Sequence, residues 1–306
     1  MKIITYLKDA YELLDSSVVA LGNFDGVHKG HQYLIEHAVK LANNQGIHSV
    51  VFTFTNHPLN YISGENIVKN IQSFEEKLSS IETLGVDYVV ALPFDEGMMK
   101  MTAERFAKHI LSSALKCKIA VCGFNYTFGA GGAGKADNLM QLGEKYGFET
   151  VILPEYDIDG KLVSSSNIRL FIQEGRMEDF ELFTGRKYAI NGTVIQGNHI
   201  GTGIGFPTAN LNLDSSMVLP LNGVYLTNIY VNNSEYKGVT NVGNKPTIGV
   251  YNKNAETHIF DFEGDLYGET IKIEFVKMLR EERKFDSVDL LREQIKKDCA
   301  EAKKYC

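Results

Sequence analysis

The sequence predicts two domains, an α/β nucleotide-binding domain followed by an antiparallel β domain. The chain has 306 residues, which is more than one hydrophobic core usually covers. Strand-like and helix-like segments alternate as far as residue 153, and the character of the chain changes after Arg169. We therefore place the domain boundary near Thr184, with one domain at residues 1–184 and the other at residues 185–306.

The first domain is expected to contain a parallel sheet. Each apolar, strand-like run precedes a segment with helical periodicity. The expected pairs are 18–24 with 31–45, 49–54 with 74–84, 88–92 with 103–114 and 119–123 with 138–146, and a strand at 150–153 closes the series. Strands that alternate with helices pair in parallel, with helices on both faces and ligands at the carboxyl ends of the strands. The pattern indicates a Rossmann-like fold.

The second domain is expected to be an antiparallel barrel or sandwich that follows a short helical stretch at 170–183. Its glycine-punctuated strands are expected at 188–196, 223–231, 236–242, 256–262 and 270–277, with turns at 232–233 and 263–265. A helix is expected at 286–304, because an Asp286-Ser287 cap signal precedes a stripe of apolar residues on one helical face. This terminal helix should pack against the β domain.

Composition narrows the expected partners to small molecules. The net charge of −7 and the pI of about 5.7 argue against a protein-wide attraction to nucleic acid or to anionic membranes. The sequence contains no apolar run of transmembrane length and no secretory signal pattern at its start, so a cytoplasmic location is expected. The four cysteines form no Cys-x-x-Cys pair, which favours ordinary thiols over a zinc site or disulfides.

Residues 28–31 form a His-x-Gly-His element at the expected strand-to-helix turn. Three-residue spacing places His28 and His31 on the same side of a helix. The unpaired N–H groups and partial positive charge of a helix N-terminus could hold ATP phosphates there, while both imidazoles bind the α-phosphate in the transition state. On these four residues alone, incidental polar side chains at a helix start explain the pattern equally well.

A second phosphate-handling pattern, GFPTANL, lies at residues 205–211 in β-rich sequence. If the segment from Thr208 is extended, Thr208 and Asn210 project to the same face and can supply oxygen ligands to a magnesium ion held by ATP phosphates. The alternative is a Gly-Pro turn followed by a strand with outward polar residues. Residues 129–135 match a Walker A loop, but Ala136 replaces the metal-binding hydroxyl, so a mobile glycine-rich flap is expected there instead.

The first half resembles the adenylyltransferase module of the prokaryotic bifunctional riboflavin kinase/FAD synthetases. Residues 22–31 (GNFDGVHKGH) resemble the opening signature of this family, and the segments at 53–58, 123–129 and 163–169 match in the same order. The resemblance implies transfer of an adenylyl group from ATP to FMN, giving FAD and pyrophosphate, with His28 and His31 as the catalytic pair. It implies nucleotide contacts from Gly22, Phe24, Asp25, Gly30, Asn125, Ser164, Ser165 and Arg169, and flavin contacts from His57, Pro58 and Phe128.

The second half resembles the riboflavin kinases of the same family, which implies a β-barrel. Residues 205–211, 238–247, 256–262 and 278–285 match in order. The match makes Glu256 the general base that accepts the proton of the riboflavin 5′-hydroxyl. The resemblance implies nucleotide contacts from Gly205, Pro207 and Asn241, flavin contacts from Arg280 and Phe285, and magnesium ligands at Thr208 and Asn210.

The resemblance therefore implies conversion of riboflavin to FMN and then to FAD with two ATP and Mg²⁺, by a monomer or weak homo-oligomer. The chain departs from the family pattern at Thr202, Ala130 and Ala133, where basic residues are common, and at Ser166, where threonine is usual. Two alternatives remain open. One half could have lost its activity through these substitutions, or the chain could be a flavin- or nucleotide-binding regulator without turnover.

Overall fold

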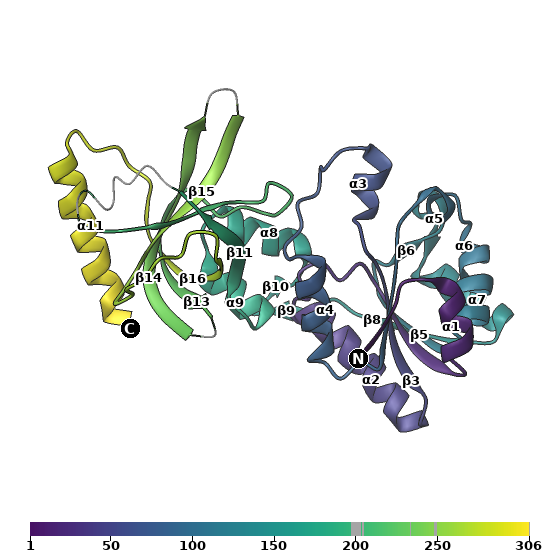
Figure 1. Ribbon diagram of the computed structural model, residues 1–306. Coiled ribbons are helices and arrows are strands. Elements are labelled where there is room, and N and C mark those ends of the chain that lie inside the picture. Colours follow the sequence, from purple (N-terminus) through teal and green to yellow (C-terminus); the bar gives the residue numbers. More distant parts are fainter. Residues whose placement is uncertain (197–202, 204, 233, 248–249, 306) are drawn as a thin grey trace. The chain divides into compact units, whose positions relative to one another are not determined.

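The computed structural model describes residues 1–196, 203, 205–232, 234–247 and 250–305. The chain divides into two compact units, Met1–Ser165 and Ser166–Cys306 (Figure 1). Thr202, one of the departures from the family pattern, lies outside the described residues.

The N-terminal unit is built on a six-stranded parallel sheet in the order β1-β4-β3-β2-β5-β8. Its strands are β1 (Lys2–Ile4), β2 (Ser17–Leu21), β3 (His48–Phe54), β4 (Tyr88–Leu92), β5 (Cys117–Gly123) and β8 (Glu149–Leu153). Strands β2 and β4 are buried at every position, as expected of parallel strands with both faces covered.

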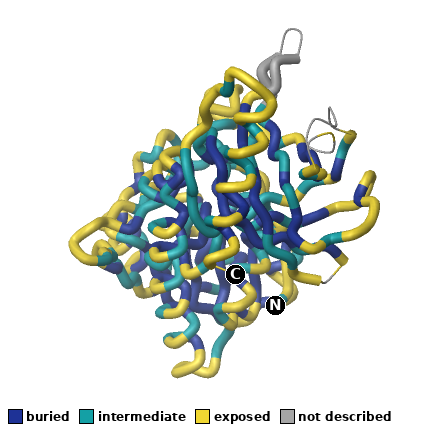
Figure 2. The backbone as a smooth tube through the Cα atoms, turned by 90° about the vertical axis from the view of Figure 1, so that its left-hand side faces the viewer, coloured by how far each residue is buried: buried dark blue, intermediate teal, exposed yellow. Residues whose placement is uncertain are grey.

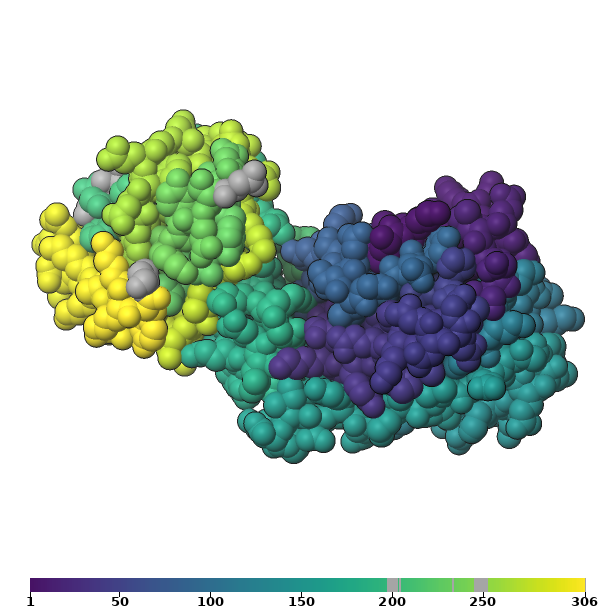
Figure 3. All heavy atoms as spheres, turned by 90° about the horizontal axis from the view of Figure 1, so that it is seen from below, coloured from purple at the N-terminus to yellow at the C-terminus, as the bar shows by residue number. Residues whose placement is uncertain are grey.

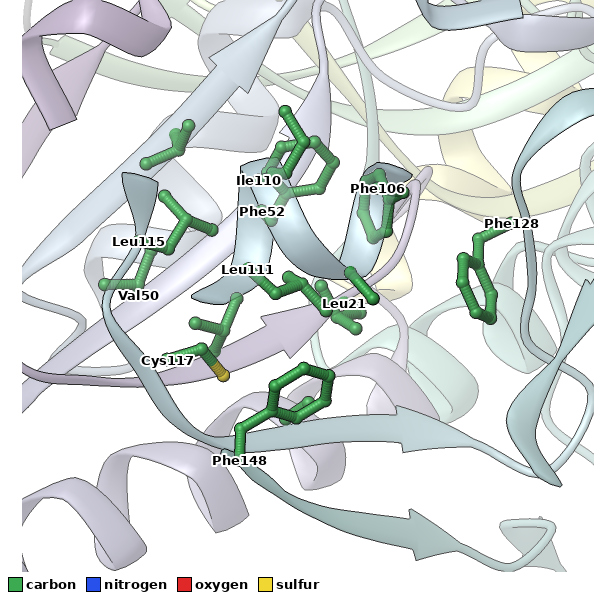
Figure 4. Close-up of a cluster of buried hydrophobic side chains, with 14 of the residues drawn as sticks. Leu21, Val50, Phe52, Phe106, Ile110, Leu111, Leu115, Cys117, Phe128 and Phe148 are labelled. Atoms are coloured by element: carbon green, nitrogen blue, oxygen red, sulfur yellow. The ribbon is translucent and has the colours of Figure 1, made fainter. Parts of the chain in front are cut away.

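Helices cover both faces of this sheet. The helices of this unit are α1 (Leu7–Leu13), α2 (Lys29–Gln45), α3 (Pro58–Ser63), α4 (Phe74–Glu82), α5 (Glu96–Met99), α6 (Ala103–Arg105), the π-helical η1 (Phe106–Ala114) and α7 (Ala136–Tyr146). In β2, Val19 and Leu21 pack in the cluster under α1, η1 and α7, whereas Val18 and Ala20 pack in the cluster under α2 and α4. Figure 4 shows the first cluster, and Figure 3 shows α2 and α4 gathered on one face of the unit.

Three short segments complete the N-terminal unit. Strands β6 (Thr127–Phe128) and β7 (Gly134–Lys135) form a small hairpin around the 3₁₀ turn η2 (Ala130–Gly132), and β9 (Asp157–Ile158) pairs with β10 (Lys161–Leu162).

The C-terminal unit is a closed six-stranded antiparallel barrel that follows helices α8 (Ser165–Gln173) and α9 (Met177–Thr184). Its strands are β11 (Tyr188–Ile195), β12 (Ala209–Asn212), β13 (Gly223–Val231), β14 (Ser234–Thr247), β15 (Val250–Ile259) and β16 (Thr270–Glu281), in the order β11-β12-β15-β14-β13-β16. Helix α11 (Val288–Ala302) and the 3₁₀ turn η3 (Lys303–Tyr305) end the unit, and α11 packs against β14 and β16.

Side chains fill the barrel interior. Thr240 Oγ1 lies 2.8 Å from Thr227 Oγ1 and 2.9 Å from Thr257 Oγ1, so three fully buried hydroxyls form a chain of hydrogen bonds across β13, β14 and β15. Tyr225 and Phe275 are buried beside them, with ring centroids 5.1 Å apart. Figure 2 shows long buried stretches in both units, with exposed residues in the connections. A barrel of this size leaves the outer face as the place for a ligand.

The structure confirms the expected fold class, and it resolves barrel against sandwich in favour of the barrel. Sequence reasoning missed β1, α1 and α3. The expected hairpin turn at 263–265 is wrong, because β15 pairs with β12 and β14 while β16 pairs with β11 and β13. The turn between β13 and β14 is present, with Asn232 at a φ of 46°, and Asn233 lies outside the described residues. The boundary near Thr184 stays a prediction.

Candidate active sites

The turn between β2 and α2 has an unusual backbone. Phe24 and Val27 have φ values of 52° and 35°, in the left-handed region that bulky side chains avoid. The ring of Phe24 folds over Gly22, where an added Cβ would lie 2.8 Å from Phe24 Cζ. Gly22 therefore allows the close approach on which the shape of the turn depends.

Contacts from three other segments hold this turn. Thr53, at the end of β3, donates its hydroxyl to the Asn23 carbonyl oxygen over 3.0 Å. Ser165 Oγ donates to the Asp25 carbonyl oxygen over 2.9 Å, and the Ile71 N–H donates to Asp25 Oδ1 over 3.1 Å. Two residues predicted to bind nucleotide, Asp25 and Ser165, are thus in direct contact.

His28 and His31 lie together at the N-terminus of α2. Their rings stack with centroids 3.6 Å apart and an angle of 16° between the ring planes. His28 caps the helix, because its Nδ1 accepts the backbone N–H of His31 over 3.2 Å. An accepting Nδ1 places the proton of the neutral ring on Nε2, which leaves Nε2–H of His28 as a donor.

The ring of His31 is buried and has a lowered pKa. Its Nδ1 is buried and has no hydrogen-bond partner in the described part of the chain. Burial is the main cause that holds the pKa of His31 well below its usual value, and the neighbouring His28 and Lys77 add to it. Gly30 leaves space beside the His28 ring, since a Cβ at this position would lie only 3.3 Å from His28 Nδ1.

The predicted pyrophosphate contacts lie at the start of α8. Ser165 and Arg169 are four residues apart, so they share one side of this helix, and Ser164 precedes it. Ser165 belongs to the N-terminal unit and Arg169 to the C-terminal unit.

An open pocket lies between the β2–α2 turn and the start of α4. Its lining residues come from the turn, from the end of β3 and from α4: Asn23, Asp25, Phe54, Thr55, Asn56, His57, Asn70, Gln72, Ser73, Phe74 and Lys77. His57 caps α3, with its Nδ1 accepting the Leu59 N–H over 3.3 Å, and Pro58 is the first residue of that helix. The predicted flavin contact His57 thus shares a pocket with the predicted nucleotide contact Asp25.

Asn125 and Phe128 occupy different environments. Asn125 is exposed just beyond β5, whereas Phe128 is 6% exposed and packs against Phe106 in the hydrophobic core. The glycine-rich segment that is expected to be a flap forms the β6–β7 hairpin, and the Ala130 N–H donates to the Met101 carbonyl oxygen over 2.7 Å.

Strand register aligns four predicted site residues of the C-terminal unit. Asn210 of β12 pairs with Glu256 of β15, and Glu256 pairs in turn with Asn241 of β14. Asn241 pairs with Val224, which pairs with Arg280 of β16. Directly opposed residues point to the same face of a sheet. The interior threonines occupy the neighbouring positions, so this row of polar residues lies on the outer face of the barrel.

Glu256 and Asn210 are held differently within this row. The buried Asn254, two residues before Glu256, donates its Nδ2–H to Glu256 Oε1 over 3.1 Å. Asn210 is 5% exposed and its Nδ2 lies 3.3 Å from the Thr208 carbonyl oxygen. Its Oδ1 is buried without a hydrogen-bond partner among the described residues. Such an unsatisfied oxygen suits a cation ligand.

His258 anchors the loop that precedes β12. Its Nδ1 lies 2.9 Å from the Pro207 carbonyl oxygen, and because a carbonyl only accepts, Nδ1 donates. The Phe206 ring meets the His258 ring edge-on at 5.3 Å. Gly205 has a φ of 87°, which explains glycine at that position.

Arg280 joins the barrel to α11. Its guanidinium contacts both carboxylate oxygens of Asp298, with distances of 2.8 to 3.1 Å, and Asp298 is 5% exposed. The guanidinium carbon also lies 5.7 Å from the ring centre of Phe285, the other predicted flavin contact. Arg280 and Phe285 are therefore neighbours.

Sequence reasoning missed Lys77, Asn254 and His258. Lys77 had a visible signal, since it lies on the apolar face of α4 that also carries Phe74 and Ile81, at spacings of three and four residues. Asn254 and His258 depend on strand pairing and loop position, for which the sequence carries no local signal.

Comparisons with known proteins agree with the two-unit architecture. A family model described as FAD synthetase matches residues 11–167, and one described as riboflavin kinase matches residues 184–306. The bifunctional riboflavin kinase/FMN adenylyltransferase of Bacillus subtilis is 39% identical over 297 residues, covering 94% of this chain and 92% of its own length. The protein of the same name from Buchnera aphidicola is 34% identical over 309 residues, covering 100% of this chain and 99% of its own.

A crystal structure described as a macrolide-efflux protein from Streptococcus pneumoniae is similar over the whole fold. Its TM-score is 0.90 at 33% sequence identity, with 98% of each chain covered. In the described part of this chain, no helix is long and apolar enough to cross a membrane. Two family models and full-length relatives agree, so the chain belongs to the bifunctional riboflavin kinase/FMN adenylyltransferase family.

Proposed function

We propose that each of the two units of this chain carries out one of the two reactions of the family, with the residues named below. The chain phosphorylates riboflavin to FMN with ATP, and it adenylylates FMN to FAD with a second ATP, releasing pyrophosphate. We assign adenylyl transfer to residues 1–184 and riboflavin phosphorylation to residues 185–306. The observation that carries this assignment is the presence of one phosphate-handling constellation in each unit, the histidine pair at α2 and the polar row on the barrel.

In adenylyl transfer, an oxygen of the FMN phosphate attacks the α-phosphorus of ATP, and the bond to the pyrophosphate oxygen breaks. Negative charge grows on the α-phosphate oxygens at the N-terminus of α2. We assign its stabilisation to Nε2–H of His28, to His31 and to the first backbone N–H groups of the helix. Gly22, Phe24, Asp25 and Gly30 shape the turn around ATP.

The other contacts of this half follow from position. Ser164, Ser165 and Arg169 hold the departing pyrophosphate through hydroxyl and guanidinium donors. His57 lines the pocket and Pro58 begins the helix after it, and we assign both residues to the flavin. We assign Asn125 to the nucleotide and Phe128 to the flavin. Because Phe128 is packed in the core, its contribution is to shape the wall behind the flavin rather than to present a mobile ring.

In riboflavin phosphorylation, the 5′-hydroxyl attacks the γ-phosphorus of ATP and the bond to ADP breaks. Glu256 accepts the hydroxyl proton, with Asn254 fixing one carboxylate oxygen so that the other faces the substrate. Asn241 is next to Glu256 in the row, and Gly205 and Pro207 lie in the loop before β12, where they contact the nucleotide. Arg280 and Phe285 border the flavin.

Magnesium fits the residues at the end of β12. The unsatisfied Oδ1 of Asn210 and the Thr208 hydroxyl are hard oxygen donors, the type that Mg²⁺ prefers. Two protein ligands with ATP phosphates and water are the usual set for this ion. Bound there, the ion would offset charge on the transferring phosphoryl group. Among the described residues, no group of three His, Cys, Asp or Glu side chains forms another metal site.

We also propose the partners, the location and the oligomeric state of the enzyme. Its net charge of −7 favours small-molecule partners over nucleic acid or anionic membranes, and we assign it to the cytoplasm as a monomer or weak homo-oligomer.

Two incubations of the purified chain test this function. With ATP and Mg²⁺, riboflavin should yield FMN and then FAD, and supplied FMN should yield FAD, as followed by chromatography of the flavins. EDTA in place of Mg²⁺ should stop FMN formation. Product from only one substrate would mean that one half is inactive, and flavin binding without any product would favour a regulator over an enzyme.

A further inference from the structure

Lys77 is a buried cation whose three donors are all used. It lies on α4 and is only 8% exposed. Its Nζ is 2.9 Å from the Phe54 carbonyl oxygen, 3.3 Å from the Asn23 carbonyl oxygen and 3.3 Å from Thr53 Oγ1. Its own helix supplies the Phe74 ring, 5.3 Å from Nζ. Lysines are almost never buried to this extent unless they are paired, so we expect that Lys77 has a specific role at this position.

The three oxygens belong to the ends of two neighbouring strands. Asn23 lies in the β2–α2 turn, whereas Thr53 and Phe54 end β3. Thr53 also donates to the same Asn23 carbonyl oxygen, so Lys77 and Thr53 close one network across both strand ends. These contacts are additional to the backbone hydrogen bonds of the helices and the sheet. They fix the position at which the turn leaves the sheet.

That turn is the strained part of the adenylyltransferase half. The positive φ values of Phe24 and Val27 are strained for residues that carry a side chain, and such conformations persist only where the surroundings hold them. Val27 directly precedes the cap residue His28, so the shape of the turn sets the placement of both histidine rings. Contacts that hold Asn23 and Asp25 therefore also determine where the rings of His28 and His31 lie.

Lys77 is also coupled to the charged groups around it. Burial lowers its pKa to about 8, and the carboxylate of Asp25 opposes this shift. Its positive charge is one of the causes that lower the pKa of His31. The other titratable groups around it are His31 on α2 and His57, which lines the same pocket. Lys77 thus acts on the turn through hydrogen bonds to the backbone, and on His31 also through its charge.

We propose that Lys77 is a positioning residue for adenylyl transfer, whose buried ammonium joins the ends of β2 and β3 and so holds the turn that places His28 and His31. This inference rests on the proposed role of the two histidines. The contacts that carry this role are those of Lys77 with backbone and hydroxyl oxygens of the chain.

The test compares Lys77→Met, which keeps the length of the side chain, with Lys77→Arg, which keeps the charge and the donors. Lys40→Met is the matched control, because Lys40 is exposed on α2. Initial rates of FAD formation from FMN are measured over ranges of FMN and ATP, and riboflavin phosphorylation by the same preparation is the internal standard. Circular dichroism checks that each variant is folded.

Lys77→Met should lower kcat for FAD formation on the order of 10²-fold, the effect of misplacing catalytic groups by about 1 Å, with a smaller change in KM. Lys77→Arg should recover most of this loss, and Lys40→Met should match the wild type. Riboflavin phosphorylation should be unchanged in all three. A folded Lys77→Met variant with wild-type kcat would overturn the inference.

The pH profile separates this role from simple stabilisation and does not depend on the methionine variant. Loss of the ammonium proton removes one of three donors, so kcat of the wild type for FAD formation should fall above about pH 8. In Lys77→Arg this fall should disappear, because the guanidinium stays charged. A wild-type profile that is flat to pH 9.5, or an arginine variant with the same fall, would contradict the inference.

The same experiments distinguish failure of the inference from failure of the proposed function. A wild-type chain that makes no FAD from FMN would overturn both. If the wild type is active and His31→Ala abolishes the activity while the Lys77 variants retain it, only the inference about Lys77 fails.

Discussion

His31 has a buried ring that lies beside His28 and Lys77, and this environment determines its charge. Desolvation, His28 and Lys77 all disfavour the imidazolium, so the folded pKa is well below the usual value. His31 is therefore neutral in the absence of substrate, and the anionic phosphates of ATP would favour proton uptake at the pair.

We expect His31 to stay neutral in the free protein at pH 6, where an ordinary histidine is mostly protonated. NMR titration of the histidine ring signals checks this, with the His31 signal assigned by its absence in His31→Gln. Unfolded His31 takes up a proton below about pH 6.5 and the folded ring does not, so acidification from pH 7 should destabilise the N-terminal unit. A His31 midpoint at 6.5 or above would disprove this account of the pair.

Asn254 is the residue that the structure adds to the kinase site. A hydrogen bond to a charged group contributes about 1.5–3 kcal/mol, and about 1.4 kcal/mol corresponds to tenfold in rate. Asn254→Ala should therefore lower kcat of riboflavin phosphorylation at least tenfold and leave FAD formation from FMN unchanged. Asn212→Ala is the control, because Asn212 is exposed and lies opposite Asn254 in the register. Equal kinase rates in the two variants would exclude a role for Asn254.

At the residue scale, motifs in the sequence indicate the catalytic candidates but not the residues that contact and support them. His28, His31 and Glu256 stand in motifs that are readable in order along the chain. Lys77 and Asn254 act through a turn, a strand end and a pairing register, which bring together residues far apart in the sequence. Their contacts therefore became visible only in three dimensions.

At the scale of elements, the ion pair between β16 and α11 is the main polar contact of the terminal helix. Arg280 and Asp298 are both largely buried, and the bidentate geometry satisfies both oxygens of the carboxylate. Gln294 of the same helix adds a hydrogen bond to Asp298 Oδ1 over 2.7 Å. The contact positions Arg280 beside Phe285 while it holds α11 on the barrel.

Removing the buried carboxylate should destabilise the C-terminal unit. Asp298→Ala leaves the guanidinium without its partner, which typically costs about 3–5 kcal/mol and corresponds to a fall of roughly 10 °C in the melting temperature of a unit this size. Glu293→Ala removes only an exposed pair with Lys296 and should shift melting by a degree or two. Thermal unfolding followed by circular dichroism measures both. Equal shifts would mean that the buried pair adds no stability beyond that of a surface pair.

Element prediction succeeded where periodicity was strong. The core strands β2 to β5 and helix α2 were expected within a few residues of their bounds, because buried parallel strands read as continuous apolar runs. The short elements β1, α1 and α3 carry too few residues for a periodic signal. The turn at 263–265 was misjudged as a hairpin, since strand neighbours in a closed barrel need not be neighbours in sequence.

At the scale of the whole molecule, each unit contains its own core and its own constellation of polar residues. The N-terminal unit has two clusters of buried side chains on the two faces of its sheet, and the barrel has a filled interior. The sequence predicted this division through a change from alternating strands and helices to glycine-punctuated strands. It could not predict the strand order β12-β15-β14, which aligns Asn210, Glu256 and Asn241.

The most direct test of two independent active sites is a double dissociation with Glu256→Ala and His31→Ala. Each purified variant is supplied with ATP and Mg²⁺, once with riboflavin and once with FMN, and the flavins are separated over time. Glu256→Ala should abolish FMN formation and still make FAD from supplied FMN, whereas His31→Ala should convert riboflavin to FMN and stop there. If either substitution silenced both activities in a folded protein, the two-site account would be contradicted.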